Sequence, residues 1–128
     1  MPMAITSQIL YDGQGNVTMQ FTGVSDGSNE TLITKVDVSE LQPPPVSVKI
    51  MDLNYDVSGG LLQFYWDALD PVKFLELAGN NSIEYNRTNG LVNAAKDLPG
   101  FTGDIKISTM GFDIGSSYSF KLVMKKKY

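Results

Sequence analysis

The chain has 128 residues, of which 42% are hydrophobic and 19% charged, so it is long enough to fold without a metal ion or a disulfide. It contains no histidine and no cysteine, the side chains that most often carry proton transfer near neutral pH, soft-metal binding and covalent attack. Its net charge of -4 argues against a nucleic-acid ligand, because phosphate binding needs clustered Lys and Arg. The composition therefore favours a scaffold or a binding protein over an enzyme.

We looked for the sequence patterns of a signal peptide and of a membrane-spanning helix. Residues 1–7 have neither a basic region nor an apolar region of the kind found in signal peptides. No stretch reaches the apolar length that a membrane-spanning helix needs. We therefore expect a protein that is neither exported through a signal peptide nor embedded in a bilayer.

The first half of the chain reads as strands with one buried face. Residues 17–21 alternate apolar and polar side chains, and residues 32–38 continue with the same period of two. The triplet at 43–45 is all proline, which cannot donate to a ladder, and it predicts a stiff crossing between two sheets. Residues 46–57 then change phase near Met51–Asp52, and this change predicts a β-bulge that bends the strand.

The second half contains the most apolar segments. In residues 61–67 the alternation places Leu62, Phe64 and Trp66 on one face, so we expect Trp66 in the core. Residues 72–77 are apolar on both faces, as in a central strand that is covered on each side or packed beside a partner subunit. Residues 91–97 could form one helical turn, which Pro99 and Gly100 would end.

Residues 105–108 and 118–125 complete the series of alternating segments. Together they predict an all-β fold, an antiparallel β-sandwich of about eight strands that is jelly-roll-like or immunoglobulin-like, with at most one short helical turn. We expect one domain over residues 1–128. Residues 1–8 and 125–128 are predicted to be short arms beyond the sandwich, free in the monomer unless another subunit binds them.

Acidic residues suggest two kinds of chemical site. Two acidic loops, at residues 12–16 and 26–30, carry oxygen ligands at alternate positions, but plain β-turns explain both. A carboxylate pair could act as the acid and nucleophile of a glycosidase, although Asp at strand ends usually serves turn hydrogen bonds. The carboxylates in the middle of the chain are Asp52, Asp56, Asp67, Asp70, Glu76 and Glu84.

Aromatic side chains on a sandwich can also form a platform that binds sugars, because the tyrosine hydroxyl tolerates partial exposure. Core packing with the hydroxyl at the surface is the plainer interpretation of the same residues. The candidates for either role are Tyr55, Tyr65, Tyr85 and Tyr118. The basic run at 125–127 is interpreted either as a solvated tail that blocks edge-to-edge pairing or as a site that docks an acidic surface.

The order of landmarks from Tyr65 to Leu122 resembles a family of small virion structural proteins encoded by tailed bacteriophages, some of which are capsid cement or decoration proteins. The segment at 22–26 and the apolar run into the prolines are similar too. This chain departs from the family where Asn89 precedes Gly90 in place of a Gly-Gly pair, and where Tyr65 replaces a second Trp. The motifs that carry the resemblance are Tyr65-Trp66-Asp67-Ala68, Pro71-Val72, Leu77-Ala78-Gly79, Gly90-Leu91, Asn93-Ala94-Ala95, Thr102-Gly103-Asp104-Ile105, Ser108-Thr109-Met110-Gly111 and Gly115-Ser116-Ser117-Tyr118-Ser119.

The resemblance implies a non-enzymatic protein on the outside of an icosahedral phage head, without a cofactor, that bridges neighbouring major capsid protein subunits. It would be made in the host cytoplasm and reside in the virion, with self-association as a dimer or trimer on the capsid. The expected capsid or subunit interface lies in the two arms, at Ile5, Thr6, Ser7, Lys125, Lys126 and Lys127. Alternatives are a head-completion, tail-terminator or tail-tube subunit, a carbohydrate-binding module and, last, a hydrolase that depends on Asp67 or Glu76.

Overall fold

A computed structural model describes residues 4–27, 29–85 and 89–128, and the side chains from Ser7 onward within these ranges. The described residues form antiparallel strands and one short 3-10 turn, so the predicted all-β antiparallel fold is confirmed. The elements are β1 (Ala4–Asp12), β2 (Asn16–Val24), β3 (Ile33–Val36), η1 (Val38–Glu40), β4 (Ser47–Trp66), β5 (Val72–Glu84), β6 (Ile105–Met110) and β7 (Ser117–Lys127).

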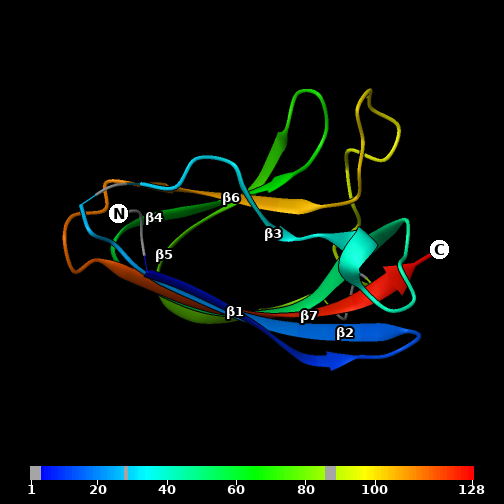
Figure 1. Ribbon diagram of the computed structural model, residues 1–128, viewed down its shortest axis with the longest axis horizontal. Helices are drawn as coiled ribbons and strands as arrows, with labels where there is room; N and C mark the ends of the chain where they lie inside the picture. Colours follow the sequence, from blue (N-terminus) through cyan, green and yellow to red (C-terminus); the bar gives the residue numbers. More distant parts are fainter. Residues whose placement is uncertain (1–3, 28, 86–88) are drawn as a thin grey trace.

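The strands are arranged as two layers that share β4 and β5 (Figure 1). β1, β2 and β7 lie in one layer, and β6 and β3 lie in the other, in the order β1-β2-β7-β4-β6-β3. The first half of β4 pairs with β7 and its second half pairs with β6, while β5 pairs with β4 along both halves. The sheet therefore curls back on itself and encloses the core between its two ends.

A glycine and breaks in the register with the neighbouring strands determine where β4 bends. Gly59 has a φ of 95°, in the region that glycine adopts without strain, and the pairing with β5 shifts between Val57 and Leu62. A second irregularity lies between Ile50 and Asp52, where the sequence predicts a bulge, and this prediction is confirmed. The segments that the sequence divides into several strands are thus one bent strand of 20 residues.

Of the two interpretations of residues 72–77, the central strand is wrong, whereas packing beside a partner subunit stays a prediction. β5 pairs only with β4 among the strands of the described chain, so it forms an outer edge. Phe64 faces Leu75 and Tyr65 faces Lys73, which leaves Phe74 as an extra residue in β5. Such a bulge turns successive side chains toward the same layer, and this is why the run looks apolar on both faces.

Aromatic side chains join the two layers through the core. Phe21 of β2 stacks on Phe120 of β7 with ring centroids 4.7 Å apart, and Phe120 meets the edge of Phe64, from the other layer, at 4.9 Å. Trp66 is fully buried, as predicted, and stacks on Phe74 at 3.9 Å. Offset and edge-to-face contacts of this kind add to the area that the rings bury, so the layers are held face to face at their centre.

Neither arm stands free of the sheet. β1 begins at Ala4 and pairs with β2, with Ala4 opposite Val24, while residues 1–3 lie outside the described part of the chain. At the other end, Lys125 to Lys127 belong to β7 and pair with the start of β4. The alternating pattern of β7 extends into the basic run, since Met124 and Lys126 both face inward. The expectation of free arms at 4–8 and 125–127 is therefore corrected.

The one helical turn is also in a different place from the predicted one. Residues 94–97 form turns and not a helix, although the Leu98 N–H donates to the Ala95 carbonyl at 3.0 Å. Val38–Glu40 instead forms a 3-10 turn capped by the Asp37 side chain, which accepts a hydrogen bond from the Ser39 N–H at 3.0 Å. This cap satisfies a backbone donor at the start of the turn. The proline triplet follows and carries the chain from β3 in one layer to β4 in the other, as predicted.

Candidate functional site

The residues expected at an interface differ in their accessibility. Ser7 is exposed on β1, and the side chains of Ile5 and Thr6 lie outside the described residues. Lys125 and Lys127 are exposed on the outer side of β7, but Lys126 points into the protein. Alternation along the strand separates the three lysines in this way, because neighbouring side chains point to opposite faces.

Lys126 forms a buried ion pair that fastens the end of β7 to the hairpin of β1 and β2. Its Nζ lies 2.6 Å from Asp12 Oδ1 and donates to the Pro43 carbonyl at 3.1 Å. The lysine side chain has no exposed surface, and that of Asp12 is 15% exposed. Burial raises the pKa of Asp12, but the hydrogen bonds from Lys126 and the Gln42 N–H outweigh it and the net pKa is lowered. Lys126 therefore supports the fold and does not present its charge to a partner.

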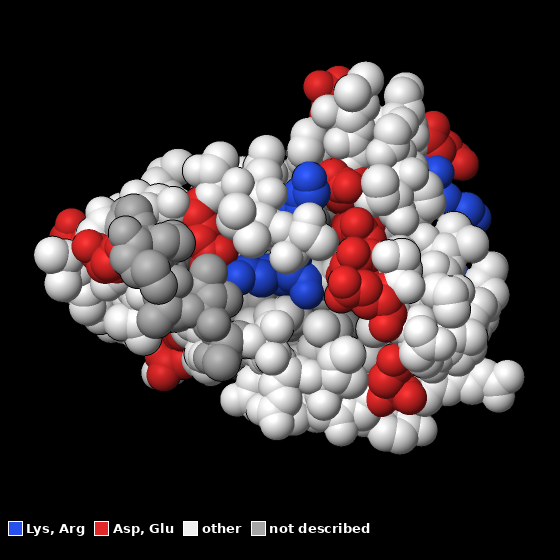
Figure 2. Space-filling model, viewed as in Figure 1, with Lys and Arg blue, Asp and Glu red and all other residues white. Residues whose placement is uncertain are grey.

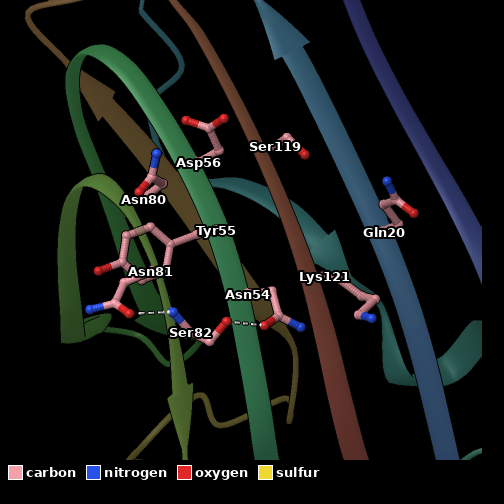
Figure 3. Close-up of a pocket in the computed structure, with 9 residues that line it drawn as sticks. All are labelled: Gln20, Asn54, Tyr55, Asp56, Asn80, Asn81, Ser82, Ser119 and Lys121. Carbon is pink, nitrogen blue, oxygen red and sulfur yellow. Dashed lines mark hydrogen bonds between the residues drawn. The ribbon is translucent and has the colours of Figure 1, made fainter.

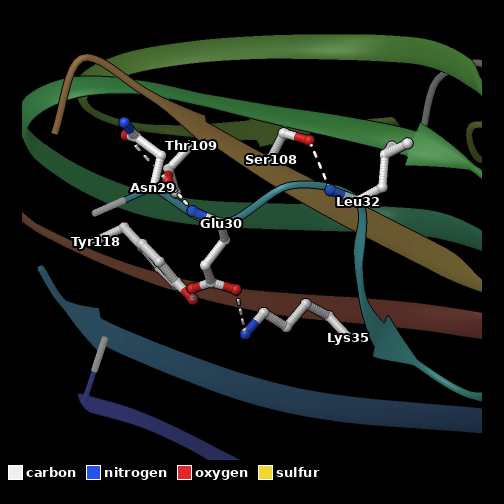
Figure 4. Close-up of polar contacts among 7 residues, drawn as sticks. All are labelled: Asn29, Glu30, Leu32, Lys35, Ser108, Thr109 and Tyr118. Atoms are coloured by element: carbon white, nitrogen blue, oxygen red, sulfur yellow. Dashed lines mark hydrogen bonds and ion pairs between the residues drawn. The ribbon is translucent and has the colours of Figure 1, made fainter. Parts of the chain in front are cut away.

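A second buried polar group joins the two layers (Figure 4). Glu30 accepts a hydrogen bond from the Tyr118 hydroxyl of β7 at 2.5 Å and pairs with Lys35 of β3 at 3.1 Å. Its backbone N–H donates to Thr109 Oγ1 of β6 at 2.8 Å, and its carbonyl accepts from the Thr109 N–H at 2.9 Å. Each oxygen of the carboxylate has a partner, so this cluster (the Glu30 cluster) is a structural connection.

Two of the central carboxylates, Asp67 and Glu76, use their oxygens within the protein, as Asp12 and Glu30 of the acidic loops do. Asp67 pairs with Lys106 at 3.2 Å and accepts a hydrogen bond from Thr102 Oγ1 at 2.7 Å. Glu76 accepts a hydrogen bond from Gln63 Nε2 at 2.8 Å, and this bond, together with Lys73, lowers its pKa. A general acid needs its pKa raised, so the environment of Glu76 works against that role. The described residues contain no group of three or more acidic side chains that could hold a metal ion.

A shallow polar depression (the polar trough) crosses the outer face of β2, β7, β4 and β5 (Figure 3). The strand register builds it: Gln20 lies opposite Lys121, Lys121 opposite Asn54, and Asn54 opposite Ser82. The neighbouring row contains Asp56, Ser119 and Asn80. With about 590 Å³ of space and mainly amide and hydroxyl groups, the trough offers alternating donors and acceptors to a polar ligand.

The four tyrosines expected as a sugar platform do not gather in the polar trough. Tyr55 lines it, partly buried, and Tyr85 is also partly buried. Tyr118 is 2% exposed and belongs to the Glu30 cluster, so a ligand cannot reach it. Tyr65 directs its hydroxyl to Gln63, at 3.4 Å. The trough is therefore a site for hydrogen bonding with at most one aromatic wall.

Two loops project together from the body, at the top of Figure 1, and end in exposed leucines. Leu69 follows β4 and is 75% exposed, and Leu98 precedes β6 and is 42% exposed. The Leu69 N–H donates to the Pro99 carbonyl at 2.9 Å, which locks the loops to each other. The Asp67 N–H donates to the Asp104 carbonyl at 3.1 Å and supports the base. Residues 68–70 and 98–100 thus form a braced apolar protrusion, which we call the loop tip.

Charge is not separated into a single-sign patch on the face shown in Figure 2, where basic side chains lie next to acidic ones. A nucleic-acid interface would gather basic side chains along one stripe. In the ranges that the structure describes, there is also no helix with the length and hydrophobicity required to cross a membrane.

No protein-family model matches the chain, and no curated protein does. Solved structures with a similar course of the chain include a cupin superfamily protein from Desulfitobacterium hafniense, at 11% identity and a TM-score of 0.40 over 100% of this chain and 82% of that chain. A cupin domain from Bordetella pertussis has 10% identity and a TM-score of 0.40 over 96% of each chain. At these values the similarity carries no inference about the function of this chain.

Neither the loop tip nor the polar trough was predicted from the sequence. Leu69 stands between Ala68 and the turn residues Asp70 and Pro71, and an apolar side chain in a turn was the available signal. The trough had no signal of its own, because its members are spread over four strands and only the register brings them together.

Proposed function

We propose that the chain is a non-enzymatic virion structural protein of a tailed bacteriophage, a cement or decoration protein that binds the outside of the head and stabilises contacts between major capsid protein subunits. The proposal starts from the resemblance carried by the motifs between Tyr65 and Ser119. Several of the carboxylates that could have served chemistry are committed to internal partners, which is what a scaffold needs.

The loop tip is the observation that carries the proposal. Leu69 and Leu98 are large apolar side chains that the fold exposes instead of burying, on loops that hydrogen bonds hold in place. Apolar anchors that are ordered before binding lose little conformational entropy when they enter a pocket of a partner. On a capsid, which repeats the same pocket many times, a modest contact of this kind is strengthened when subunits bind at several points at once.

The sheet edges support self-association on the capsid. β1 pairs only with β2, and β5 pairs only with β4, among the described strands. Ile9 and Leu10 of β1 are 48% and 46% exposed, so this edge presents both unpaired backbone groups and apolar side chains. A second copy of the chain could extend the sheet there, as strands do in peptide recognition by edge addition.

Stoichiometry in purified particles tests the proposal. Quantitative mass spectrometry of phage particles gives the ratio of this protein to the major capsid protein. A ratio near unity, or a simple fraction of it, supports decoration of the lattice. A trace ratio would replace the proposal with a head-completion, tail-terminator or tail-tube role, in which few copies form a closed ring. Absence from particles would refute a virion role altogether.

A second candidate function, glycan binding, is favoured by the polar trough. Asn54, Asn80 and Gln20 supply amides there, and Ser82 and Ser119 supply hydroxyls, on neighbouring strands. Such groups match the paired donors and acceptors of a sugar. A glycan array tests it with the wild-type protein and the Asn54→Ala variant as control. Binding that the variant loses would support this function, and an array without hits would exclude it.

A further inference from the structure

Where the start of β4 meets the end of β7, basic side chains gather without acidic partners among the described residues. Lys49 lies directly opposite Lys125, and Lys127 lies opposite Ser47, two positions along the same pair of strands. Like charges on directly opposite residues repel each other and destabilise a sheet. Elsewhere in the protein, carboxylate partners are present for Lys35, Lys73, Lys106 and Lys126. The cluster at the start of β4 and the end of β7 differs from these lysines in having no such partner among the described residues.

Lys49 is the most unusual member of the cluster because it is buried. Its residue surface is only 4% exposed, and its aliphatic stem packs beside Gly90, where an added Cβ would lie 2.8 Å from the lysine Cδ. Within the described residues, no ion pair or side-chain hydrogen bond satisfies its ammonium group. Burial lowers the pKa of Lys49, and the charges of Lys127 and Lys125 lower it further. A buried cation in this position lacks the counter-charge that such groups normally have.

A pocket of about 320 Å³ opens at this place. Lys49, Lys96 and Lys127 line it, and the remaining wall is mainly apolar. The exposed apolar part consists of Val46, Val92 and Tyr128. The pocket therefore combines a positive rim with space for a small hydrocarbon group, the combination typical of sites for organic anions.

Asn93 supplies an independent sign of a missing ligand. It lines the pocket and is 8% exposed, and its Oδ1 accepts the Ala95 N–H at 2.8 Å. That bond sets the orientation of the amide and leaves Nδ2 as a buried donor without a partner in the described chain. Buried donors are nearly always paired, so an unpaired one beside three lysines indicates an acceptor that comes from outside the protein.

We infer that this pocket binds a small organic anion, with a carboxylate held by Lys49, Lys127 and Asn93 Nδ2 and an apolar body against the exposed side chains of Val46 and Val92. The proposal does not depend on the capsid role. The ligand would neutralise the repulsion between β4 and β7 and would satisfy the Asn93 amide. It would thereby tighten the junction where the last strand meets the longest one.

The test uses the full chain and benzoate as the probe, followed by amide shifts in two-dimensional NMR and by thermal unfolding. We expect benzoate to shift the Asn93 side-chain amide and the backbone amides around Lys49 and Lys127, and to raise the unfolding temperature. Benzyl alcohol has the same apolar body without the charge, and inorganic phosphate has charge without the body. Both should bind at least about tenfold more weakly than benzoate, since each lacks one of the two features of the pocket.

Three variants separate this site from general surface charge. Lys49→Met retains the stem that packs on Gly90 and should weaken benzoate at least about tenfold. Asn93→Asp retains the oxygen that accepts from Ala95 but replaces the donor with a carboxylate, so it should abolish binding and raise the stability of the unliganded protein. Lys121→Met, on β7 but in the polar trough, should leave binding unchanged. Equal binding of benzyl alcohol, an equal loss in Lys121→Met, or undiminished binding in Asn93→Asp would each overturn the proposal.

Discussion

Tyr118 in β7 donates its hydroxyl to Glu30 across the interior of the sandwich, at 2.5 Å, and the two residues are 88 positions apart in the chain. Glu30 also pairs with Lys35 and is bonded through its backbone to Thr109, so one side chain connects both layers. A buried carboxylate is tolerated only with such partners, since an uncompensated charge in the interior is strongly unfavourable. The sandwich is thus joined by a polar connection in addition to its aromatic core.

The variant Tyr118→Phe tests this connection. It removes one donor to a buried carboxylate, so we expect the free energy of unfolding to fall by about 1–3 kcal/mol at pH 8. Tyr11→Phe, at a site that is 60% exposed, should change it by less than about 0.5 kcal/mol. Urea denaturation of both variants measures the difference. Equal stability of the two variants would show that the bond contributes nothing to the fold.

The raised pKa of Tyr118 predicts that the protein loses stability in alkali. Burial raises the pKa of Tyr118 well above its usual value of 10, and the hydrogen bond and the charge of Glu30 raise it further. The folded state therefore keeps the hydroxyl proton of Tyr118 at a pH at which the unfolded state has begun to lose it. The contribution of this hydroxyl to the free energy of unfolding is complete below pH 10 and declines as the pH rises above 10. Stability measured between pH 9 and pH 11 should fall less steeply in Tyr118→Phe than in the wild type. Parallel slopes would contradict the prediction.

Lys126 and Lys125 are neighbours in β7, but we expect their substitutions to differ greatly in their effect on stability. Lys126→Met leaves the Asp12 carboxylate without its ion pair and should cost about 2–3 kcal/mol, somewhat less than a fully buried pair because Asp12 keeps some exposure. Lys125→Met removes an exposed charge and should change stability by less than about 0.5 kcal/mol. The pKa of Asp12 is lowered in the folded state, so the difference between the wild type and Lys126→Met should shrink as the pH falls below 3.8. Denaturation curves at pH 7 and pH 3 provide both measurements.

Gly103 and Gly79 form a second matched pair. Both have positive φ angles, 89° and 73°, so alanine is strained at either site by about 1 kcal/mol. A Cβ at Gly103 would also lie 2.1 Å from the Val46 carbonyl oxygen, whereas a Cβ at Gly79 meets no atom within 4 Å. We therefore expect Gly103→Ala to destabilise the protein by at least about 2 kcal/mol more than Gly79→Ala. Thermal unfolding measures the gap, and similar midpoints would refute the close approach of these two segments.

If the loop tip contacts the capsid, its substitution should affect capsid binding and not stability. Leu69→Ser and Leu98→Ser should reduce binding to purified capsids at least about tenfold, because truncated apolar anchors lose more than 1 kcal/mol each when they fill a pocket. Ile114→Ser is the control, since Ile114 is 82% exposed but lies in the loop between β6 and β7. Cosedimentation with capsids measures the affinity, and unchanged melting temperatures show that the fold is intact. An equal loss in Ile114→Ser would indicate general stickiness and not a specific contact.

Much of the fold could be predicted from local pattern. The period of two in residues 17–21 and 118–124 determines which side chains face the core, because a strand turns successive residues to opposite faces. The prolines at 43–45 and the phase change near Met51 predicted a crossing and a bulge, and both are present. These features depend on a few neighbouring residues, which is why the amino-acid order alone is sufficient to find them.

Pairing partners could not be predicted in this way. The extra residue Phe74 made an edge strand look like a central one, and the basic ending at Lys125–Lys127 looked like a tail although it is paired with β4. A bulge changes which face a residue occupies, and its presence depends on the strand alongside. Local pattern contains no information about that neighbour.

Local amino-acid order therefore sets the all-β class, the inward faces of the clearest strands and the shortage of side chains for acid-base and soft-metal chemistry. Three contacts appear only in the folded chain: Glu30 with Tyr118, Lys49 opposite Lys125, and Leu69 hydrogen-bonded to Pro99. The difference lies in distance along the chain. Alternation acts between neighbours, whereas these contacts form between segments that meet only after the sheet has curled and its register is set.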